Sequence, residues 1–550
     1  MKIRDAQRKS KGGLLYSTLV SITYLLYVFK DQIYSLIAIE RRVVPLEFRQ
    51  DANLYLGQIN LALRSQSISD NPFWLESQKG DPNLVGKNIF LYMWGSVTRE
   101  GNINLITSYF LLVACCSFAI AFIFCRYFEV YIPGKNAKCW VALLCLMGTL
   151  GEFAFRPSPT ELGLPILCFV VCSFWNQLST KKSHNAFLLS LVYLCILFFV
   201  NPFYCIFFFF FVFGAIFLFY FKSSKVKLIS TVVLTSVLIS SGDIFASIII
   251  PRLNSDLVFR WGLLESHFPG SMNSTLALLA VIVILKVKKW QGRDAKSDDF
   301  LLIFALATIM SLQQNLLSGI WWEPESHYRY LVNIVVLLSA MSFIRSLNCR
   351  LEKVKFLAFG FALITFPIFV IGYLVPGSGE SRFPSDLMNI KLNSSMLVSR
   401  TTELESLRLQ LLSRTTNESE VLITNSTVEE SGLLSLAALL AERRLVWSYE
   451  GSLLSGSNRQ ILHRFFCASG RDEIEAISLD EITRTQGHRF VNSLDHFSKW
   501  YEVKNLFLKT KIDFRNVLEN REKDILSQAL PFSKEAHCPN MQVIQIAATS

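Results

Sequence analysis

The chain has 550 residues, of which 51% are hydrophobic and only 18% are charged, and it contains 45 phenylalanines. Soluble globular proteins carry about a quarter charged residues, so the composition argues against a water-soluble protein and predicts an integral membrane protein. The net charge of +11 does not indicate nucleic acid as a partner, because the basic residues lie in short segments between apolar runs and form no contiguous basic face.

A helix needs about 20 mainly apolar residues to cross a bilayer, and the sequence predicts about eleven such spans. The first follows a basic N-terminus and ends at Lys30-Asp31-Gln32 without a small-residue cleavage site, which is typical of an uncleaved signal anchor. The expected spans are 14–29, 105–125, 138–154, 161–177, 186–200, 203–221, 228–248, 273–287, 299–314, 329–345 and 356–375.

The charges of the loops predict the orientation of these spans. With the N-terminus in the cytoplasm, the inside segments are 1–13, 126–137, 178–185, 222–227, 288–298 and 346–355, and they hold lysine clusters such as Lys181-Lys182 and Lys288-Lys289. The outside segments hold scattered arginines, and the alternation continues through every span, as the positive-inside rule expects. This favours an odd number of helices and an extracytoplasmic C-terminal region.

Two domains follow from this orientation. Residues 1–375 are expected to form a transmembrane domain with a long first outer loop, 30–104. Residues 376–550 are expected to form a small extracytoplasmic soluble α/β domain, because 421–424 reads as a buried strand, 430–442 as a helix and 444–448 as a second strand. Helices are also expected at 472–485 and 515–530. Whether Cys467 and Cys538 form a disulfide stays open.

The first outer loop carries the first candidate site, Phe48-Arg49-Gln50-Asp51-Ala52-Asn53-Leu54-Tyr55. An acid followed four residues later by an aromatic residue places Asp51 and Tyr55 on one face of a short helix. A carboxylate at the membrane edge can act as a general base or can help to hold a metal ion against a phosphate. The alternative is a solvated interfacial acid beside an anchoring tyrosine.

The loop 249–272 carries the second candidate site. Arg260 has the chemistry to bind an oxyanion through two hydrogen bonds, and Glu265 or His267 can move a proton. The alternative, weighted equally, is an interfacial loop that caps the next helix.

The third candidate site follows Gln313-Gln314-Asn315, in the outer segment between the ninth and tenth spans. Two carboxylates, a histidine and an arginine occur within seven residues, beside the tryptophans of an interfacial aromatic belt. Ionisable groups at membrane depth are costly, which favours a functional role. The residues concerned are Trp322, Glu323, Glu325, His327 and Arg329.

These features resemble the GT-C superfamily of integral-membrane glycosyltransferases. The resemblance rests on Asp51 and Tyr55 after the first helix, on Asn71-Pro72-Phe73, on the Gln-Gln-Asn and His327-Tyr328 elements, on the helix count and on the outer C-terminal domain. The family commonly has a tandem acidic pair before the tyrosine, whereas residue 50 is Gln. That departure weakens the transfer of a metal-binding role, so a divalent metal ion is a candidate cofactor whose ligands stay unknown.

The resemblance implies transfer of a sugar from a polyprenyl-phosphate carrier to an acceptor on the outer face of the membrane, in a bacterial inner (plasma) membrane. The catalytic candidates are Asp51, Glu323, Glu325 and His327. The substrate-binding candidates are Tyr55, Arg260, Glu265, His267, Trp322 and Arg329. The alternatives are a lipid or solute transporter or flippase, and a non-enzymatic membrane assembly protein. The sugar, the acceptor and the oligomeric state stay open.

Overall fold

The computed structural model describes most of the expected helices and a small three-stranded sheet. The described residues are 11–38, 50–68, 70–73, 88–128, 131, 146, 159–179, 183–220, 264–265, 271–290, 296–318, 320–321, 324–346, 390–417, 420–423, 431–446 and 541–544. The chain divides into two compact units. The first comprises Met1–Pro45, Tyr109–Gly242 and Ser266–Val398, and the second comprises Leu46–Ser108, Asp243–Glu265 and Ser399–Ser550.

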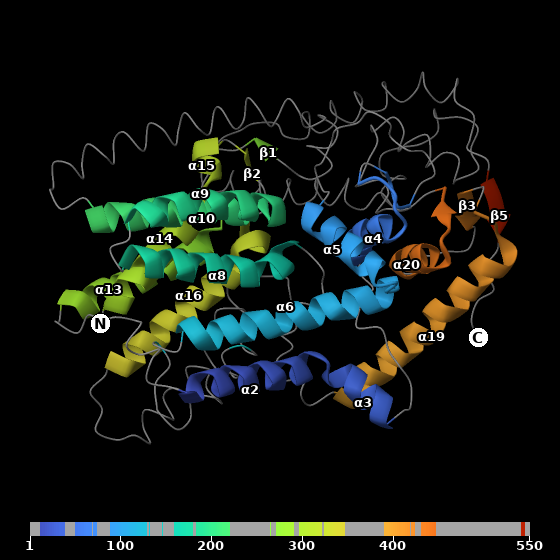
Figure 1. Ribbon diagram of the computed structural model, residues 1–550, viewed down its shortest axis with the longest axis horizontal. Helices are drawn as coiled ribbons and strands as arrows, with labels where there is room; N and C mark the ends of the chain where they lie inside the picture. The colour runs from blue at the N-terminus through green and yellow to red at the C-terminus, as the bar shows by residue number, and fades with distance from the viewer. Residues whose placement is uncertain are drawn as a thin grey trace, which may run out of the picture. The chain divides into compact units, whose positions relative to one another are not determined.

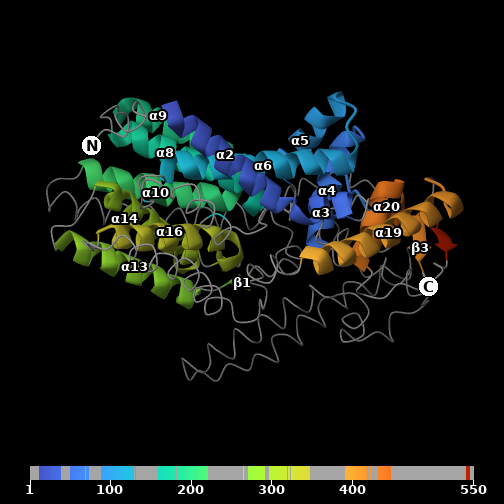
Figure 2. The ribbon, with the colours of Figure 1, turned by 90° about the horizontal axis from the view of Figure 1, so that it is seen from below.

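The first unit is built mainly of long helices. Helices α8, α9, α10, α13, α14 and α16 run side by side (Figures 1 and 2), with α14 packed on α10, α13 and α16, and α9 packed on α8 and α10. The elements of this unit are α2 (Lys11–Val28), α3 (Lys30–Ala38), most of α6 (Leu105–Phe128), α8 (Pro159–Ser179), α9 (Ser183–Val200), α10 (Pro202–Tyr220), α13 (Met272–Trp290), α14 (Lys296–Leu312), α15 (Asn315–Ser318), β2 (Ile320–Trp321) and α16 (Pro324–Ser346).

Eight of the eleven expected spans coincide with helices to within a few residues, namely 14–29, 105–125, 161–177, 186–200, 203–221, 273–287, 299–314 and 329–345. The spans 138–154, 228–248 and 356–375 lie outside the described residues apart from Leu146. Within the described part of the chain, α6 alone is long and apolar enough to cross a membrane, and shorter apolar helical stretches occur at Leu15–Val28, Leu162–Leu178, Leu189–Val200 and Pro202–Phe217. The helical positions are confirmed, whereas the crossing of a membrane stays a prediction.

Aromatic side chains fill the interior where α8, α10 and α14 meet. The ring of Phe300 lies 5.4 Å from that of Trp175 and 5.7 Å from that of Phe211. Phe207 packs on Phe304 with ring centroids 5.0 Å apart. Such pairs add about 0.5–1.5 kcal/mol each beyond the burial of their area, so part of the phenylalanine excess serves to hold the helices together.

A buried ion pair joins α13, α14 and α16. Lys288 Nζ lies 2.8 Å from Asp298 Oδ2, and both side chains are less than a tenth exposed. The Ser342 hydroxyl donates to Asp298 Oδ1 at 2.7 Å and accepts from Lys288 Nζ at 2.8 Å. The sequence predicts an inside loop over 288–298. That prediction is wrong at both ends, because α13 continues to Trp290 and α14 begins at Lys296, so both charges lie on helices.

The second unit combines two short crossing helices with a small sheet. Its described elements are α4 (Gln50–Leu63), α5 (Ile89–Glu100), β1 (Leu264–Glu265), most of α19 (Ile390–Arg414), β3 (Glu420–Ile423), α20 (Ser431–Ala441), β4 (Arg444–Leu445) and β5 (Met541–Ile544). The first outer loop 30–104 therefore contains helices α3, α4 and α5. At the α4–α5 crossing a Cβ on Gly95 would lie only 2.5 Å from the Ile59 carbonyl oxygen, so the close approach requires glycine.

The sheet has the order β4-β3-β5 and is parallel throughout. The strand–helix–strand prediction for 421–424, 430–442 and 444–448 is confirmed, because β3, α20 and β4 occupy these positions. Strand β5 had no counterpart among the predictions. The helices expected at 472–485 and 515–530 lie outside the described residues, as do Cys467 and Cys538.

The sheet and α4 are joined by the segment 70–73. The Leu445 N–H donates to the Phe73 carbonyl at 2.9 Å, which continues the backbone hydrogen bonding beyond the outer edge of β4. On its other side the segment packs on α4, because a Cβ on Gly57 would lie 2.7 Å from Pro72 Cγ. Phe73 is 1% exposed. The Asn71-Pro72-Phe73 element therefore connects the first outer loop to the C-terminal sheet.

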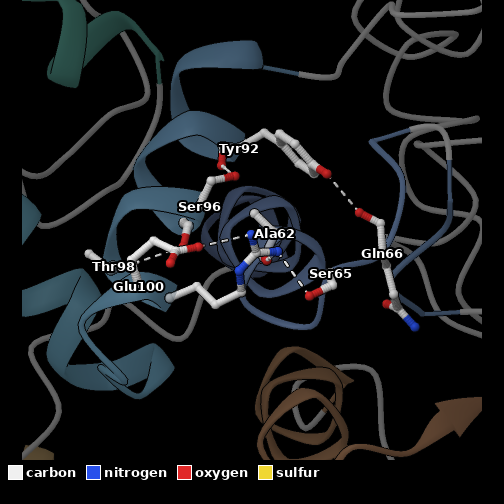
Figure 3. Close-up of polar contacts among 9 residues, drawn as sticks. Ala62, Ser65, Gln66, Tyr92, Ser96, Thr98 and Glu100 are labelled. Carbon is white, nitrogen blue, oxygen red and sulfur yellow. Dashed lines mark hydrogen bonds and ion pairs between the residues drawn. The ribbon is translucent and has the colours of Figure 1, made fainter.

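Arginines cap successive helices of this unit at their C-terminal ends. Arg99 of α5 donates to the Ala62 carbonyl and to the Ser65 hydroxyl at the end of α4, at 3.3 and 2.9 Å (Figure 3). Arg64, at the end of α4, donates to the Leu439 carbonyl near the end of α20 at 2.8 Å. Arg443, after α20, donates to the Thr415 carbonyl beyond α19 at 2.8 Å. Cations are favourable at helix C-termini, so the series ties α5, α4, α20 and α19 together.

Candidate functional site

The second unit presents the first candidate group on α4. Asp51 lies in the first turn of this helix, and Tyr55 lies one turn later. The predicted short helix through both residues is therefore confirmed. The structure does not describe the Asp51 side chain, whereas that of Tyr55 is half-buried. Asn53, Leu54 and Gln58 are buried, so most of the helix is held on several sides.

The first unit contains His327 of α16, which belongs to the third candidate site of the sequence. Thr160 Oγ1 and His327 Nδ1 are 3.2 Å apart, with the donor set by the histidine tautomer. The imidazole stacks on the ring of Phe203, with centroids 3.6 Å apart and 13° between the planes. The hydroxyl of Tyr204 donates to the Thr160 carbonyl, and the hydroxyl of Tyr328 donates to the Phe203 carbonyl. These contacts fix the ring of His327 between α8 and α10.

Three helices begin at this cluster, each with proline at its first position: α8 at Pro159, α10 at Pro202 and α16 at Pro324. Proline suits this position because its missing N–H has no partner within the helix. The beginning of a helix also leaves backbone N–H groups and the positive end of the dipole available to an anion. The cluster formed by Thr160, Phe203, Tyr204, His327 and Tyr328 is called the His327 junction below.

Two further hydrogen bonds involve polar residues beside helices of the first unit. Asn201 caps α10 by accepting the Phe203 N–H at 3.0 Å. The Gln313 amide, just after α14, donates to Thr275 in the first turn of α13 at 2.7 Å. The polar Gln313-Gln314-Asn315 element is thus used at least in part to join α14 to α13, and Gln314 and Asn315 are buried.

Apart from Tyr55 and His327, Arg329 is the predicted site residue whose side chain the structure describes. The exposed Arg329 donates to the Tyr330 hydroxyl at 2.8 Å, with its guanidinium 4.7 Å from the ring centroid. Glu265 lies in β1 and Glu325 in the first turn of α16, but their side chains are not described. Arg260, His267, Trp322 and Glu323 lie outside the described residues.

Metal binding finds no support in the described side chains. Among them, no group of three or more His, Cys, Asp and Glu residues is placed to hold a metal ion, and Asp51 is outside that comparison.

Sequence reasoning missed Thr160 and Phe203, which contact His327, and Tyr204, which donates to the Thr160 carbonyl. Each lies just after a proline that starts an apolar helix, and a hydroxyl or aromatic residue at such a place is common at membrane interfaces. Only their convergence in space distinguishes them.

No protein-family model matches the chain, and no curated protein or solved structure shows significant similarity to it.

Proposed function

We propose that the chain is an integral-membrane glycosyltransferase that takes a sugar from a polyprenyl-phosphate carrier and transfers it to an acceptor on the outer face of the membrane. The observation that carries the proposal is the His327 junction. A histidine fixed by a hydroxyl and an aromatic ring, where three helices begin, is suited to a phosphate group that gains negative charge as it leaves.

A membrane setting is supported by the outward faces of the helices of the first unit. On α2 the side chains at helical spacing along one face are 45–73% exposed: Leu15, Leu19, Ile22 and Leu26. Similar exposed apolar faces occur on α9 and α13, including Leu191, Ile196, Phe199, Leu276, Val283 and Val287. Monomeric soluble proteins rarely expose large contiguous apolar patches, whereas lipid covers such faces at no cost.

The chemistry assigns separate tasks to the two candidate groups. Asp51 accepts the proton of the acceptor hydroxyl, whose oxygen forms a bond to the anomeric carbon of the sugar. The bond from that carbon to the carrier phosphate breaks, and its electron pair goes to the phosphate oxygen. The negative charge that this oxygen gains requires hydrogen-bond donors, and helix N-termini such as those at the His327 junction offer donors to an anion. We assign Arg260 and Arg329 to binding the carrier phosphate, and Tyr55 and Trp322 to binding the sugar. The residues assigned to orienting the donor or the acceptor are Glu265, His267, Glu323 and Glu325.

A transporter is the second candidate, because one observation favours it. The Lys288–Asp298 pair is buried within the helical bundle, and ionisable residues inside membrane bundles often mark ion or substrate paths. This pair is fully bonded, however, with Ser342 completing it. Such closure supports a structural role for the pair.

The experiment that tests the proposal offers two classes of donor to the purified protein in proteoliposomes. Radiolabelled sugar is supplied either on a polyprenyl phosphate or on a nucleoside diphosphate, with a mixture of bacterial envelope lipids and glycans as acceptors. We expect label to move from the lipid donor only. Transfer from the nucleotide donor alone, or no transfer with movement of the intact labelled lipid across the bilayer, would contradict the proposal, and the latter would favour a flippase.

A further inference from the structure

The C-terminal part of the second unit holds α4 at several points far apart in the sequence. Arg444, beside α20 and in β4, donates through one guanidinium nitrogen to the Pro72 carbonyl and through the other to Gln66 Oε1 at 2.9 Å. Gln66 and Pro72 flank the turn that follows α4. The bidentate use of the planar guanidinium fixes this turn in one orientation relative to the sheet.

Arg64 holds the C-terminal end of α4 through a second set of contacts. Its guanidinium donates to the Leu439 carbonyl at 2.8 Å and lies 3.9 Å from a Glu442 carboxylate oxygen. Ser65 lies two residues after the end of α4 and Glu442 directly follows α20, and both adopt left-handed backbone conformations, with φ of 58° and 60°. Non-glycine residues keep this conformation only where surrounding contacts hold it. Here arginines supply those contacts on both turns.

The Arg444 contacts are largely removed from water, whereas the side chain of Glu442, the acidic partner of Arg64, is 61% exposed. Arg444 is 9% exposed. Burial, assisted by the charge of Arg64, lowers the pKa of Arg444 to about 10, so the guanidinium stays charged at neutral pH. A buried arginine whose hydrogen bonds go to a backbone carbonyl and a side-chain amide oxygen of a distant segment is costly to leave without these partners. The arrangement therefore serves α4 and the turn after it.

We propose that Arg64 and Arg444 are positioning residues that fix the C-terminal end of α4 to the C-terminal part of the second unit. They thereby hold Asp51, at the other end of that helix, in the position that the reaction requires. The contacts of these two arginines are called the brace below. Because α4 is a stiff rod about 20 Å long, its orientation is set where its C-terminal end and the 70–73 segment are fixed. This inference rests on the proposed function for the role of Asp51, but the brace itself is a property of the fold.

Adjacent arginines provide a matched control. Arg443 bonds to Thr415, Asn417 and Ala441, all within the C-terminal part of the chain, whereas Arg444 bonds to residues that follow α4. Arg443→Gln removes the same charge one position away and leaves the Pro72 and Gln66 contacts intact.

The test measures hydrogen exchange of the backbone amides of 50–63 in the full-length protein, together with kcat and KM for sugar transfer. For Arg444→Gln we expect exchange in 50–63 to speed up roughly tenfold or more. The value of kcat should fall while KM for the lipid donor changes little, and Arg444→Lys should restore part of both. Arg443→Gln should leave exchange in 50–63 and transfer at wild-type values.

A milder variant covers the case in which Arg444→Gln fails to fold. Arg64→Gln leaves the Arg444 contacts in place and should still speed exchange at the end of α4. Unchanged exchange in 50–63 for both variants, or equal loosening by Arg443→Gln, would overturn the brace. If the wild-type protein transfers no sugar, the proposed function fails, while the exchange measurements alone still decide whether the brace exists.

Discussion

At the scale of single residues, the contact between His327 and Thr160 is the central feature of the His327 junction. Their 3.2 Å contact and the stacked Phe203 ring hold the imidazole in one orientation. His327→Gln keeps a hydrogen-bonding side chain but removes the imidazole, so we expect sugar transfer to fall by about 10²-fold or more. The measurement is the initial rate in proteoliposomes with protein of unchanged thermal stability.

The hydroxyl partner gives a smaller effect in the same assay. Thr160→Val leaves His327 stacked but without its Oγ1 contact, and we expect a decrease of about tenfold. Thr23→Val is the matched control, because among the described residues the Thr23 hydroxyl donates only to the Leu19 carbonyl of its own helix, at 2.9 Å. Wild-type rates for both His327→Gln and Thr160→Val would show that the junction has no part in the chemistry.

Gly95 allows a separate test of packing in the second unit. An added Cβ would meet the Ile59 carbonyl oxygen at 2.5 Å and Ala62 Cβ at 2.8 Å, so Gly95→Ala must push α5 away from α4. We expect a loss of about 1–3 kcal/mol in the free energy of unfolding, measured by denaturant titration in detergent. Gly101→Ala is the control, because its φ is −87° and its Cβ would meet the Ile103 side chain at 3.3 Å and the Thr98 carbonyl oxygen at an ordinary contact distance of 3.5 Å. Equal stability of the two variants would contradict the described helix crossing.

At the scale of elements, the Lys288–Asp298 pair fixes α13 and α14 to each other. Lys288→Met leaves a buried carboxylate without its cation, and we expect a loss of about 3–5 kcal/mol in stability. The double variant Lys288→Met with Asp298→Leu should recover most of that loss, since no charge stays buried. Lys286→Met, at an exposed position of the same helix, should change little. A double variant less stable than the single one would mean that the pair itself is strongly stabilising.

The sequence predicted helices and strands correctly where the pattern that specifies them lies within one segment of the chain. Apolar runs placed eight helices, and the 421–448 pattern placed β3, α20 and β4, because periodicity and strand propensity are local. It could not place Lys288, since a lysine near the end of an apolar run fits an inside loop as well as a buried pair. Nor could it join Asn71-Pro72-Phe73 to β4 or Arg444 to Gln66, because these contacts connect the first loop to residues near the end of the chain.

At the scale of the whole molecule, the proposed reaction requires that the candidate residues lie on the outer side of the membrane. The loop charges predict that the N-terminus lies inside and the C-terminal region outside. Alkaline phosphatase fused after Ser550 should therefore be active in a bacterial cell, and the same enzyme fused between Lys181 and Lys182 should be inactive. Activity at both fusions, or the reverse pattern, would contradict the predicted orientation and the outward site that depends on it.

The most direct measurement of the central claim compares three proteins in proteoliposomes supplied with radiolabelled polyprenyl-phosphate sugar. The wild-type chain and Glu100→Gln, which removes an exposed acid paired only with the neighbouring Arg99 among the described contacts, should transfer label to acceptor at similar rates. Asp51→Asn should reduce transfer by about 10²-fold or more while the protein stays folded. Transfer by Asp51→Asn at the wild-type rate would contradict the assignment of Asp51 as the base.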